Sequence, residues 1–317
     1  MALWSKLISW LRRLGQAIIL SEQHLASIAR LEAPLGRLAA ALEKNEGYLS
    51  LIANASTRSQ MREVQSDPRF ADPLRLEPSG FKVHSQYDED GIIAEIFRRI
   101  GTTNRVFVEF GCGNGTQNCT GFLLMQDWRG LWIDGDPKAP FFIKHIWKPQ
   151  LARAQLVFVQ AFITVDTIDD VIRSAGFSGD VDLLVVDIDG NDYHVLEKIN
   201  AIAPRVICAE YNSNYPPSVV WAMERDDSYA WDMLDYQIGA SLKALEQLLA
   251  RRGYALVGCG IAGVNAFFVR QDLVADKFAA PFTAENHYHA WRYAYGASMS
   301  DCDWPGWRDW RRPDPRG

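Results

Sequence analysis

The chain has 317 residues, of which 48% are hydrophobic and 23% are charged, proportions that are ordinary for a globular enzyme. Its net charge is -6, so no overall basic field favours nucleic acid as a partner. The five cysteines are widely spread and form no C-x-x-C pair, which argues against zinc and disulfide frameworks and fits a reducing cytoplasm.

Residues 1–20 carry the pattern of an amphipathic helix. Basic residues occupy other faces than the apolar ones, which recur at Trp4, Leu7, Ile8, Leu11, Leu14 and Ile18. No apolar run reaches the roughly 20 residues that span a bilayer. Two interpretations are open: a helix packed on its own protein or on a partner subunit, or peripheral contact with the inner face of the membrane.

A heptad pattern follows this first segment. Its core positions are Ile28, Leu31, Leu35, Leu38, Leu42, Asn45, Leu49 and Ile52. Pro34 and Gly36 interrupt the pattern, which predicts two helices rather than one continuous coil. We expect a helical extension over 1–60 that forms a homo-oligomer or contacts a membrane surface, with an ordinary helical hairpin as the alternative. Residues 61–80 are polar and rich in proline, which predicts a linker.

The core domain is predicted to begin near residue 81. Apolar residues from Ile92 to Ile100 recur on one helix face, and Ser85 or Asp88 precedes them as a candidate cap. The run Val106–Phe110 then has the composition of a buried strand. It leads into a glycine loop, a helix expected over 119–125, and a second strand that ends on an acid. We therefore expect a strand, glycine loop, helix, strand and acid unit of the nucleotide-binding type.

The residues of that unit distinguish between two possible cofactors, a dinucleotide and S-adenosylmethionine. Asp134 follows the second strand, where its carboxylate can accept hydrogen bonds from both hydroxyls of a ribose. The dinucleotide fingerprint G-x-G-x-x-G places a glycine where this chain has Thr116. The run E109-F-G-C-G-N-G115 instead resembles motif I of S-adenosylmethionine (SAM)-dependent methyltransferases.

Later runs predict the rest of the sheet. Strands are expected at Leu156–Gln160, Asp182–Ile188, Arg205–Tyr211, Tyr254–Gly258 and Val264–Arg270. The last two must pair antiparallel, because only a few residues separate them and a parallel crossover needs a dozen or more.

A wider resemblance covers roughly residues 81–275. The stretch V83-H-S-Q-Y-D-E-D-G-I-I93, followed by the glycine loop, resembles the FkbM-like methyltransferases, a family often associated with sugar and natural-product hydroxyls. The resemblance implies a Rossmann-like α/β domain over 81–280, with a mostly parallel sheet whose last strand is antiparallel. It further implies SAM as the cofactor, contacted by Gln86, Glu109, Gly111, Gly113, Asn118, Asp134 and Asp187.

Two polar clusters are expected at the carboxyl ends of the parallel strands, where such sheets place their catalytic groups. Asp187, Asp189 and Glu210 together can hold a divalent ion such as Mg²⁺ or Mn²⁺ that orients a substrate diol. The alternative assigns Asp187 to the methionine part of SAM and makes Asp192 the cap of the next helix.

A base for the acceptor hydroxyl is expected in the same region. The catalytic candidates are Asp189, which we prefer if no metal binds, His194 and Asp187. The alternative is a structural residue of the following helix, which is the more common role of a lone histidine.

The longest insertion, 212–238, is predicted to form a lid over the acceptor. Its aromatic and acidic residues suit a sugar, whose apolar face stacks on rings while its hydroxyls bond carboxylates. The substrate candidates are Asn212, Tyr215, Trp221 and Tyr229, and a packed lid without a ligand is the alternative. The tail over 281–317 is aromatic and folds back on the lid or binds a partner.

The sequence thus predicts a cytoplasmic O-methyltransferase that acts on a hydroxyl of a sugar, glycan or glycolipid in polysaccharide biosynthesis, with or without a metal. An N- or carboxyl-methyltransferase on another small molecule is the enzymatic alternative. A scaffold protein of a glycan-assembly complex, built on a SAM-binding domain, is the non-enzymatic alternative.

Overall fold

A computed structural model describes residues 6–7, 66–231 and 236–292 of the chain. The chain divides into two compact units, 1–56 and 57–317, and the β-sheet lies in the second. The heptad pattern, most of the first amphipathic segment and the tail beyond residue 292 lie outside the described residues. None of the described helices is both long and apolar enough to cross a bilayer.

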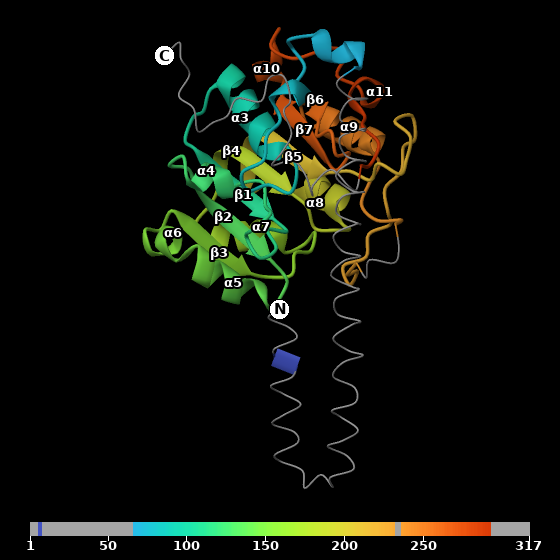
Figure 1. Ribbon diagram of the computed structural model, residues 1–317. Coiled ribbons are helices and arrows are strands. Elements are labelled where there is room, and N and C mark those ends of the chain that lie inside the picture. Colours follow the sequence, from blue (N-terminus) through green and yellow to red (C-terminus); the bar gives the residue numbers. More distant parts are fainter. Residues whose placement is uncertain (1–5, 8–65, 232–235, 293–317) are drawn as a thin grey trace, which may run out of the picture. The chain divides into compact units, whose positions relative to one another are not determined.

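A seven-stranded sheet organises the second unit, with the strand order β3-β2-β1-β4-β5-β7-β6 (Figure 1). Five neighbouring strands are parallel: β3 (Leu156–Gln160), β2 (Arg129–Asp134), β1 (Val106–Phe110), β4 (Gly179–Val186) and β5 (Ile202–Glu210). β7 (Asn265–Arg270) is antiparallel to both β5 and β6 (Tyr254–Cys259). The predicted fold class, including the antiparallel last pair, is confirmed.

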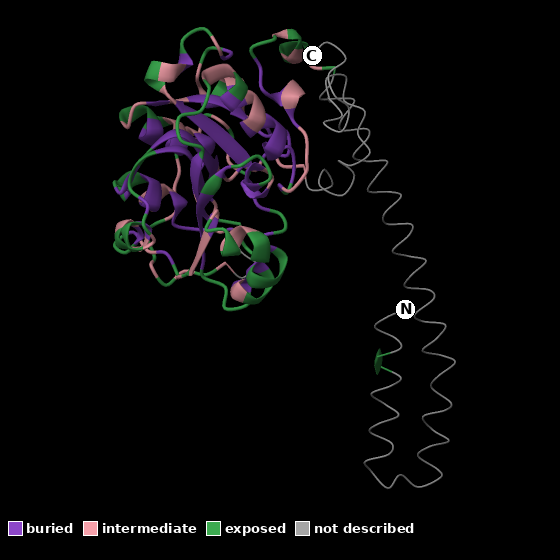
Figure 2. Cartoon of the chain, turned by 90° about the vertical axis from the view of Figure 1, so that its left-hand side faces the viewer, coloured by how far each residue is buried: buried purple, intermediate pink, exposed green. Residues whose placement is uncertain are grey.

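Alternation along the strands creates a core on each face of the sheet. Val106, Val108 and Phe110 of β1 belong to one apolar cluster, whereas Phe107 belongs to the other. The first cluster includes residues of α7 (Ile168–Ser174), α8 (Asp192–Lys198) and α9 (Leu242–Arg251). The second includes residues of α3 (Glu89–Ile100), α4 (Gly121–Leu124), α5 (Ala139–Ile146) and α10 (Gln271–Val274). Buried residues therefore fill the sheet and the inner faces of its helices (Figure 2).

The start of α3 is built differently from the predicted single cap. Asp88 occupies the cap position but makes no capping bond, and its carboxylate instead accepts from the Ile261 amide at 3.0 Å. Ser85 Oγ accepts from the Asp90 amide, while the Asp90 carboxylate accepts from the amides of residues 83–85. This reciprocal arrangement ties the segment before α3 to the first turn of the helix.

The described part of the predicted linker, 66–80, packs with the domain. It contains two 3-10 helices, η1 (Pro68–Ala71) and η2 (Glu77–Ser79). Arg75, Leu76 and Glu77 are buried, and Glu77 Oε1 lies 3.3 Å from His289 Nε2. The start of the predicted tail, including α11 (Ala284–His287), closes over the same buried charges. These two segments therefore support each other although they are about 200 residues apart in sequence.

The predicted strands are present, and their ends are shifted by as much as three residues. β4 was expected over 182–188 but spans Gly179–Val186, so Asp187 is the first residue beyond it. Two helices between β2 and β3, α5 and α6 (Lys148–Ala152), had no sequence prediction. The earlier end of β4 matters because it frees the acidic residues that follow to turn into the space above the sheet.

Position 111 requires glycine because the backbone of the loop after β4 lies very close to it. The φ of Gly111 is +73°, and a Cβ placed there would lie 1.5 Å from the Asp187 carbonyl oxygen. Gly113 also has a positive φ, +56°, but a Cβ there would meet no atom within 4 Å. The first glycine is thus required by conformation and by space, and the second by conformation alone.

We expect Gly113→Ala to cost about 1–2 kcal/mol of unfolding free energy, the penalty for a left-handed residue with a side chain. Gly111→Ala should cost roughly 1–3 kcal/mol more, because the added methyl group also forces the β1 and β4 loops apart. Denaturant unfolding of the two variants beside the wild type measures the difference. Equal costs would show that the loops can separate freely.

Candidate active site

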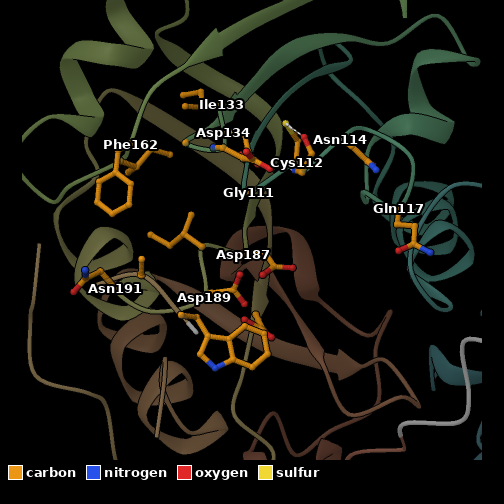
Figure 3. Close-up of a pocket in the computed structure, with 18 of the residues that line it drawn as sticks. Gly111, Cys112, Asn114, Gln117, Ile133, Asp134, Phe162, Asp187, Asp189 and Asn191 are labelled. Carbon is orange, nitrogen blue, oxygen red and sulfur yellow. Dashed lines mark hydrogen bonds between the residues drawn. The ribbon is translucent and has the colours of Figure 1, made fainter. Parts of the chain in front are cut away.

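A cavity of about 930 Å³ opens at the carboxyl ends of the parallel strands. The glycine loop and the ends of β1 and β2 form one side, whereas the loops after β4 and β5 form the other (Figure 3). Of the predicted cofactor contacts, the structure brings five to the wall of this cavity: Gln86, Gly111, Gly113, Asp134 and Asp187. The cavity therefore joins the predicted cofactor and acceptor groups in one space.

Asp134 holds the glycine loop at the end of β2. Its Oδ2 accepts from the Gly113 amide at 2.6 Å and its Oδ1 from the Asp136 amide at 2.8 Å. Burial raises the pKa of Asp134 above its ordinary value, although both hydrogen bonds oppose this shift. The carboxylate lies at the cavity wall, where each oxygen keeps a further lone pair for a ligand hydroxyl.

Glu109 and Asn118, predicted to contact the cofactor, are not among the described residues that line the cavity. The Glu109 carboxylate is buried and accepts from Asn118 Nδ2 and the Cys119 amide, both at 2.8 Å, and from Thr120 Oγ1. Both residues are therefore used inside the protein, where they shape the turn after the glycine loop. The sequence shows that the first strand carries an acid, but it does not show which residues donate hydrogen bonds to that acid.

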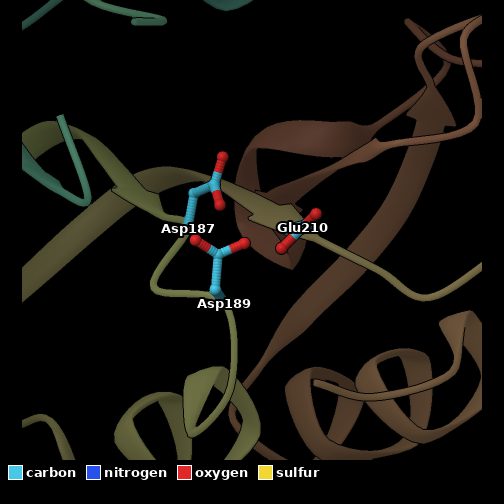
Figure 4. Close-up of side chains that lie close together, drawn as sticks. All are labelled: Asp187, Asp189 and Glu210. Atoms are coloured by element: carbon cyan, nitrogen blue, oxygen red, sulfur yellow. The ribbon is translucent and has the colours of Figure 1, made fainter. Parts of the chain in front are cut away.

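Asp187, Asp189 and Glu210 converge at the opposite side of the cavity (Figure 4). Each offers one carboxylate oxygen, and these oxygens all lie within 4.8 Å of one another. Burial, with repulsion from Asp189 and Asp192, raises the pKa of Asp187 well above its usual value. Burial and repulsion from Asp187 do the same to the pKa of Glu210. The cluster thus holds protons more tightly than isolated carboxylates do.

Asp189 has an unusual backbone conformation. Its φ is +54°, a left-handed conformation that is uncommon for a residue other than glycine. Burial, with repulsion from Asp192 and Asp134, raises the pKa of Asp189 to about 6. Asp192 accepts from the amides of Ile188 and Gly190, both at 2.9 Å, and so holds the loop that carries Asp189. Asp192 braces this loop; the capping position of α8 belongs to Asn191.

His194 does not reach the cavity wall among the described residues. Its Nε2 lies 2.9 Å from the carbonyl oxygen of Met223, which belongs to the predicted lid. This contact fits the structural interpretation of His194, whereas its role as a base stays a prediction. Its place on α8 put it near the acidic loop in sequence, but the helix directs the ring towards the lid.

Of the three aromatic residues predicted to contact the substrate, one lies at the wall of the cavity. Tyr229 lines the cavity as predicted, and Trp231 and Trp291 join it. Tyr215 and Trp221 instead stack on each other, with ring centroids 4.4 Å apart. Trp231 and Trp291 come from segments already marked as aromatic by sequence. Nothing in the sequence alone showed which rings turn inward.

Asn212 joins the start of the lid to its end. Its Nδ2 donates to the carbonyl oxygens of Tyr236 and Ile238, at 2.7 and 3.0 Å. The residue lines a small pocket beside the main cavity, where Glu210, Trp231 and Trp291 also lie. Its amide nitrogen is thus bonded to the lid backbone, and its predicted contact with a substrate stays a prediction.

Further contacts fasten the lid to the acidic loop. Asn191 Nδ2 donates to the Asp226 carbonyl oxygen at 2.7 Å, and the Asp226 amide donates back to Asn191 Oδ1 at 3.1 Å. Arg225 Nη2 lies 2.6 Å from Asp166 Oδ2, in the segment after β3. The lid thus bridges the loops on both sides of the cavity.

The sequence matches the family described as the methyltransferase FkbM domain over residues 95–256. The chain belongs to this family and is a SAM-dependent methyltransferase, as the glycine loop and Asp134 predicted. The matched range spans the sheet from α3 to β6 and includes the acidic loop. No curated protein matches the sequence significantly.

Several solved structures are similar to the chain at low sequence identity. The methyltransferase domain of bacterial CtHen1-C is 14% identical, with 58% of this chain and 97% of that chain covered and a TM-score of 0.38. Precorrin-6y C5,15-methyltransferase from Geobacter metallireducens GS-15 is 17% identical, with coverages of 62% and 97% and a TM-score of 0.36. The glycopeptide N-methyltransferase MtfA, complexed with S-adenosylhomocysteine, is 13% identical, with coverages of 56% and 85% and a TM-score of 0.36.

The contrast between Asp134 and Glu109 gives a test of the cofactor site. Asp134→Ala should weaken SAM binding by about 1–3 kcal/mol, because ribose hydroxyls would lose a buried acceptor. Glu109→Gln should instead lower the unfolding free energy, by roughly the same amount, and leave the SAM affinity of the folded protein within a few-fold of wild type. Calorimetric titration with SAM and S-adenosylhomocysteine, paired with denaturant unfolding, separates the two effects. Tight binding of NAD without SAM would overturn the assignment.

Proposed function

We propose that the protein transfers the methyl group of SAM to a hydroxyl of a sugar, glycan or glycolipid, in polysaccharide biosynthesis. The observation that carries this proposal is the shared cavity, in which three carboxylates and the aromatic residues Tyr229, Trp231 and Trp291 face the glycine loop. Aromatic faces suit the apolar side of a sugar ring, and carboxylates accept hydrogen bonds from its hydroxyls.

The chemistry requires an aligned oxygen and an acceptor for its proton. In an in-line displacement, the acceptor oxygen forms a bond to the methyl carbon while the carbon–sulfur bond breaks, which leaves S-adenosylhomocysteine. The hydroxyl proton passes to a carboxylate, for which we propose Asp189 because it projects from the acidic loop into the cavity. Positioning of the two reactants supplies most of the rate gain, and the base contributes a further factor.

The acidic cluster favours some acceptors over others. An acceptor carboxylate would face Asp187, Asp189 and Glu210 with no Lys, Arg or His among the described residues of the wall, so carboxyl methylation is disfavoured. An amine is the second candidate, because the same carboxylates attract an ammonium group and can take its proton. Intact cofactor groups at Gly111, Gly113 and Asp134 disfavour a scaffold without catalysis.

The donor set of the cluster also fits a hard divalent cation. Mg²⁺ and Mn²⁺ prefer carboxylate oxygens, and each of the three residues offers one such oxygen to the same small space. Asp187, Asp189 and Glu210 would hold it. A bound ion would lower the pKa of a coordinated acceptor hydroxyl.

A substitution and a chelator distinguish a role of Asp189 as the base from a role as a ligand of a metal ion. With Asp189 as the base, Asp189→Asn should reduce turnover by roughly 10²–10⁴-fold with SAM affinity kept, whereas Asp170→Asn, an exposed acid on α7, should change nothing. The rate should rise with pH and level off above about 6, where Asp189 loses its proton. Activity assays across pH, repeated in EDTA, provide the measurement.

Loss of activity in EDTA, restored by Mg²⁺ or Mn²⁺, would assign the cluster to an ion instead. Unchanged activity in Asp189→Asn would exclude both roles for this residue. Incubation of the enzyme and labelled SAM with glycan, glycolipid and amine-containing fractions then identifies the acceptor. A labelled product that resists glycosidases and releases a methylamine on hydrolysis would replace O-methylation by N-methylation.

We also propose that the extension over 1–60 forms a homo-oligomer or contacts a membrane surface, on the basis of its heptad and amphipathic patterns. A variant that begins at Thr57, the first residue of the second compact unit, retains the packed segment 66–80. It should keep SAM binding and change its oligomeric state or its affinity for vesicles, as measured by light scattering and flotation. If both properties match those of the full chain, neither role is correct.

A further inference from the structure

One surface segment has a charge opposite to that of the whole protein. The chain contains 39 acidic and 33 basic residues, apart from histidine, yet no Asp or Glu occurs from 137 to 165. The same stretch carries Lys138, Lys144, Lys148 and Arg153, all exposed, and the exposed His145. None of them forms an ion pair with another described residue. These cations are therefore available to an external partner.

Helix α5 presents large apolar side chains at the centre of this basic segment. Its inner face is buried through Ala139 and Ile143, which leaves the other side of the helix outside the core. Around the rest of its circumference the helix exposes Phe141 by 73%, Phe142 by 40% and Ile146 by 44%. Two neighbouring aromatic residues and an isoleucine on one short helix cost solvation free energy without contributing to the core.

The position of α5 connects this surface with the cavity. The helix follows Gly135 and Asp136, which line the cavity at the end of β2, and it lies beside β3 at the edge of the sheet (Figure 1). Phe162, which follows β3, is 55% exposed and also lines the cavity. Apolar side chains thus occur both on α5 and at the margin of the cavity.

We propose that Phe141, Phe142 and Ile146, flanked by Lys138, Lys144 and Lys148, form a surface that docks on an anionic phospholipid bilayer. We call this set the α5 face, in which Lys148 is the first residue of the adjoining α6. Aromatic and aliphatic side chains enter the boundary between headgroups and acyl chains, while flanking lysines contact acidic headgroups. The proposal does not depend on the identity of the methyl acceptor.

The charges favour a bilayer over a second copy of the chain. A two-fold interface would place the same lysines from both copies around one apolar centre, where they would repel each other. An acidic lipid surface instead neutralises all of them together. A docked α5 face would hold the nearby cavity close to the membrane.

Flotation of the full-length protein with vesicles tests the charge component. Wild type should bind vesicles of phosphatidylcholine with phosphatidylglycerol more tightly than vesicles of phosphatidylcholine alone. Lys144→Glu with Lys148→Glu should weaken that binding by more than about tenfold, since each basic residue near the surface contributes roughly fivefold. The matched control, Lys198→Glu with Arg251→Glu, makes the same change of charge on exposed parts of α8 and α9 and should bind like wild type.

A depth measurement distinguishes the α5 face from any membrane contact by residues 1–20. A nitroxide is attached to Phe141→Cys in a Cys302→Ser background; Cys112, Cys119, Cys208 and Cys259 are buried. Addition of anionic vesicles should raise collisions of the label with oxygen and lower those with a water-soluble nickel complex. The control Val220→Cys, at a residue that is 57% exposed, should keep its aqueous signature.

An unchanged label at position 141 on bound protein would overturn the proposal, whatever the first 20 residues do. So would equal vesicle binding by the α5 variant and its control. Self-association without lipid that Phe141→Ser abolishes would assign the face to a second copy instead. Retained SAM binding and circular dichroism in each variant confirm that the fold is intact.

Discussion

The backbone contact between Gly111 and the Asp187 carbonyl fixes the geometry on which the active site depends. β1 and β4 are parallel neighbours at the centre of the sheet, so the loops that leave them start side by side. One chain segment then turns towards β2 and the other towards β5, which opens a crevice between them. Because hydrogen bonds hold the two strands in register, the glycine loop and the acidic loop cannot move apart without disturbing the sheet.

The cavity between these loops has an acidic lining. Asp134, Asp187, Asp189 and Glu210 face it, and no Lys, Arg or His occurs among the described residues of its wall. SAM carries a positive sulfonium, which this lining attracts, whereas the product S-adenosylhomocysteine is neutral at sulfur. Transfer of the methyl group therefore removes one electrostatic attraction and favours exchange of the cofactor. Burial, with repulsion among the neighbouring carboxylates, explains why the acidic cluster holds protons tightly.

Segments far from the glycine loop complete the cavity. Tyr211 Oη donates to the His289 carbonyl oxygen at 2.7 Å, which anchors the chain just before Trp291 enters the cavity wall. Asn191 and Asp226 fasten the lid at the opposite loop. The acceptor side is thus assembled from the ends of β4 and β5, the lid and the C-terminal segment. These parts come from separate segments of the chain, whereas most of the cofactor side comes from the continuous unit of β1, the glycine loop and β2.

The sequence by itself determined the elements whose signals are local. Apolar runs with β-branched residues predicted the strands, the short separation of β6 and β7 predicted their antiparallel pairing, and the glycine loop with Asp134 predicted the cofactor. Only the tertiary structure decided the partners of each side chain. It placed Glu109 and Asn118 in a buried network, directed His194 to Met223, and selected Trp231 and Trp291 over Tyr215 and Trp221 for the cavity. Strand and turn propensities act over a few residues, but the direction of a side chain depends on contacts between segments that only the folded chain brings together.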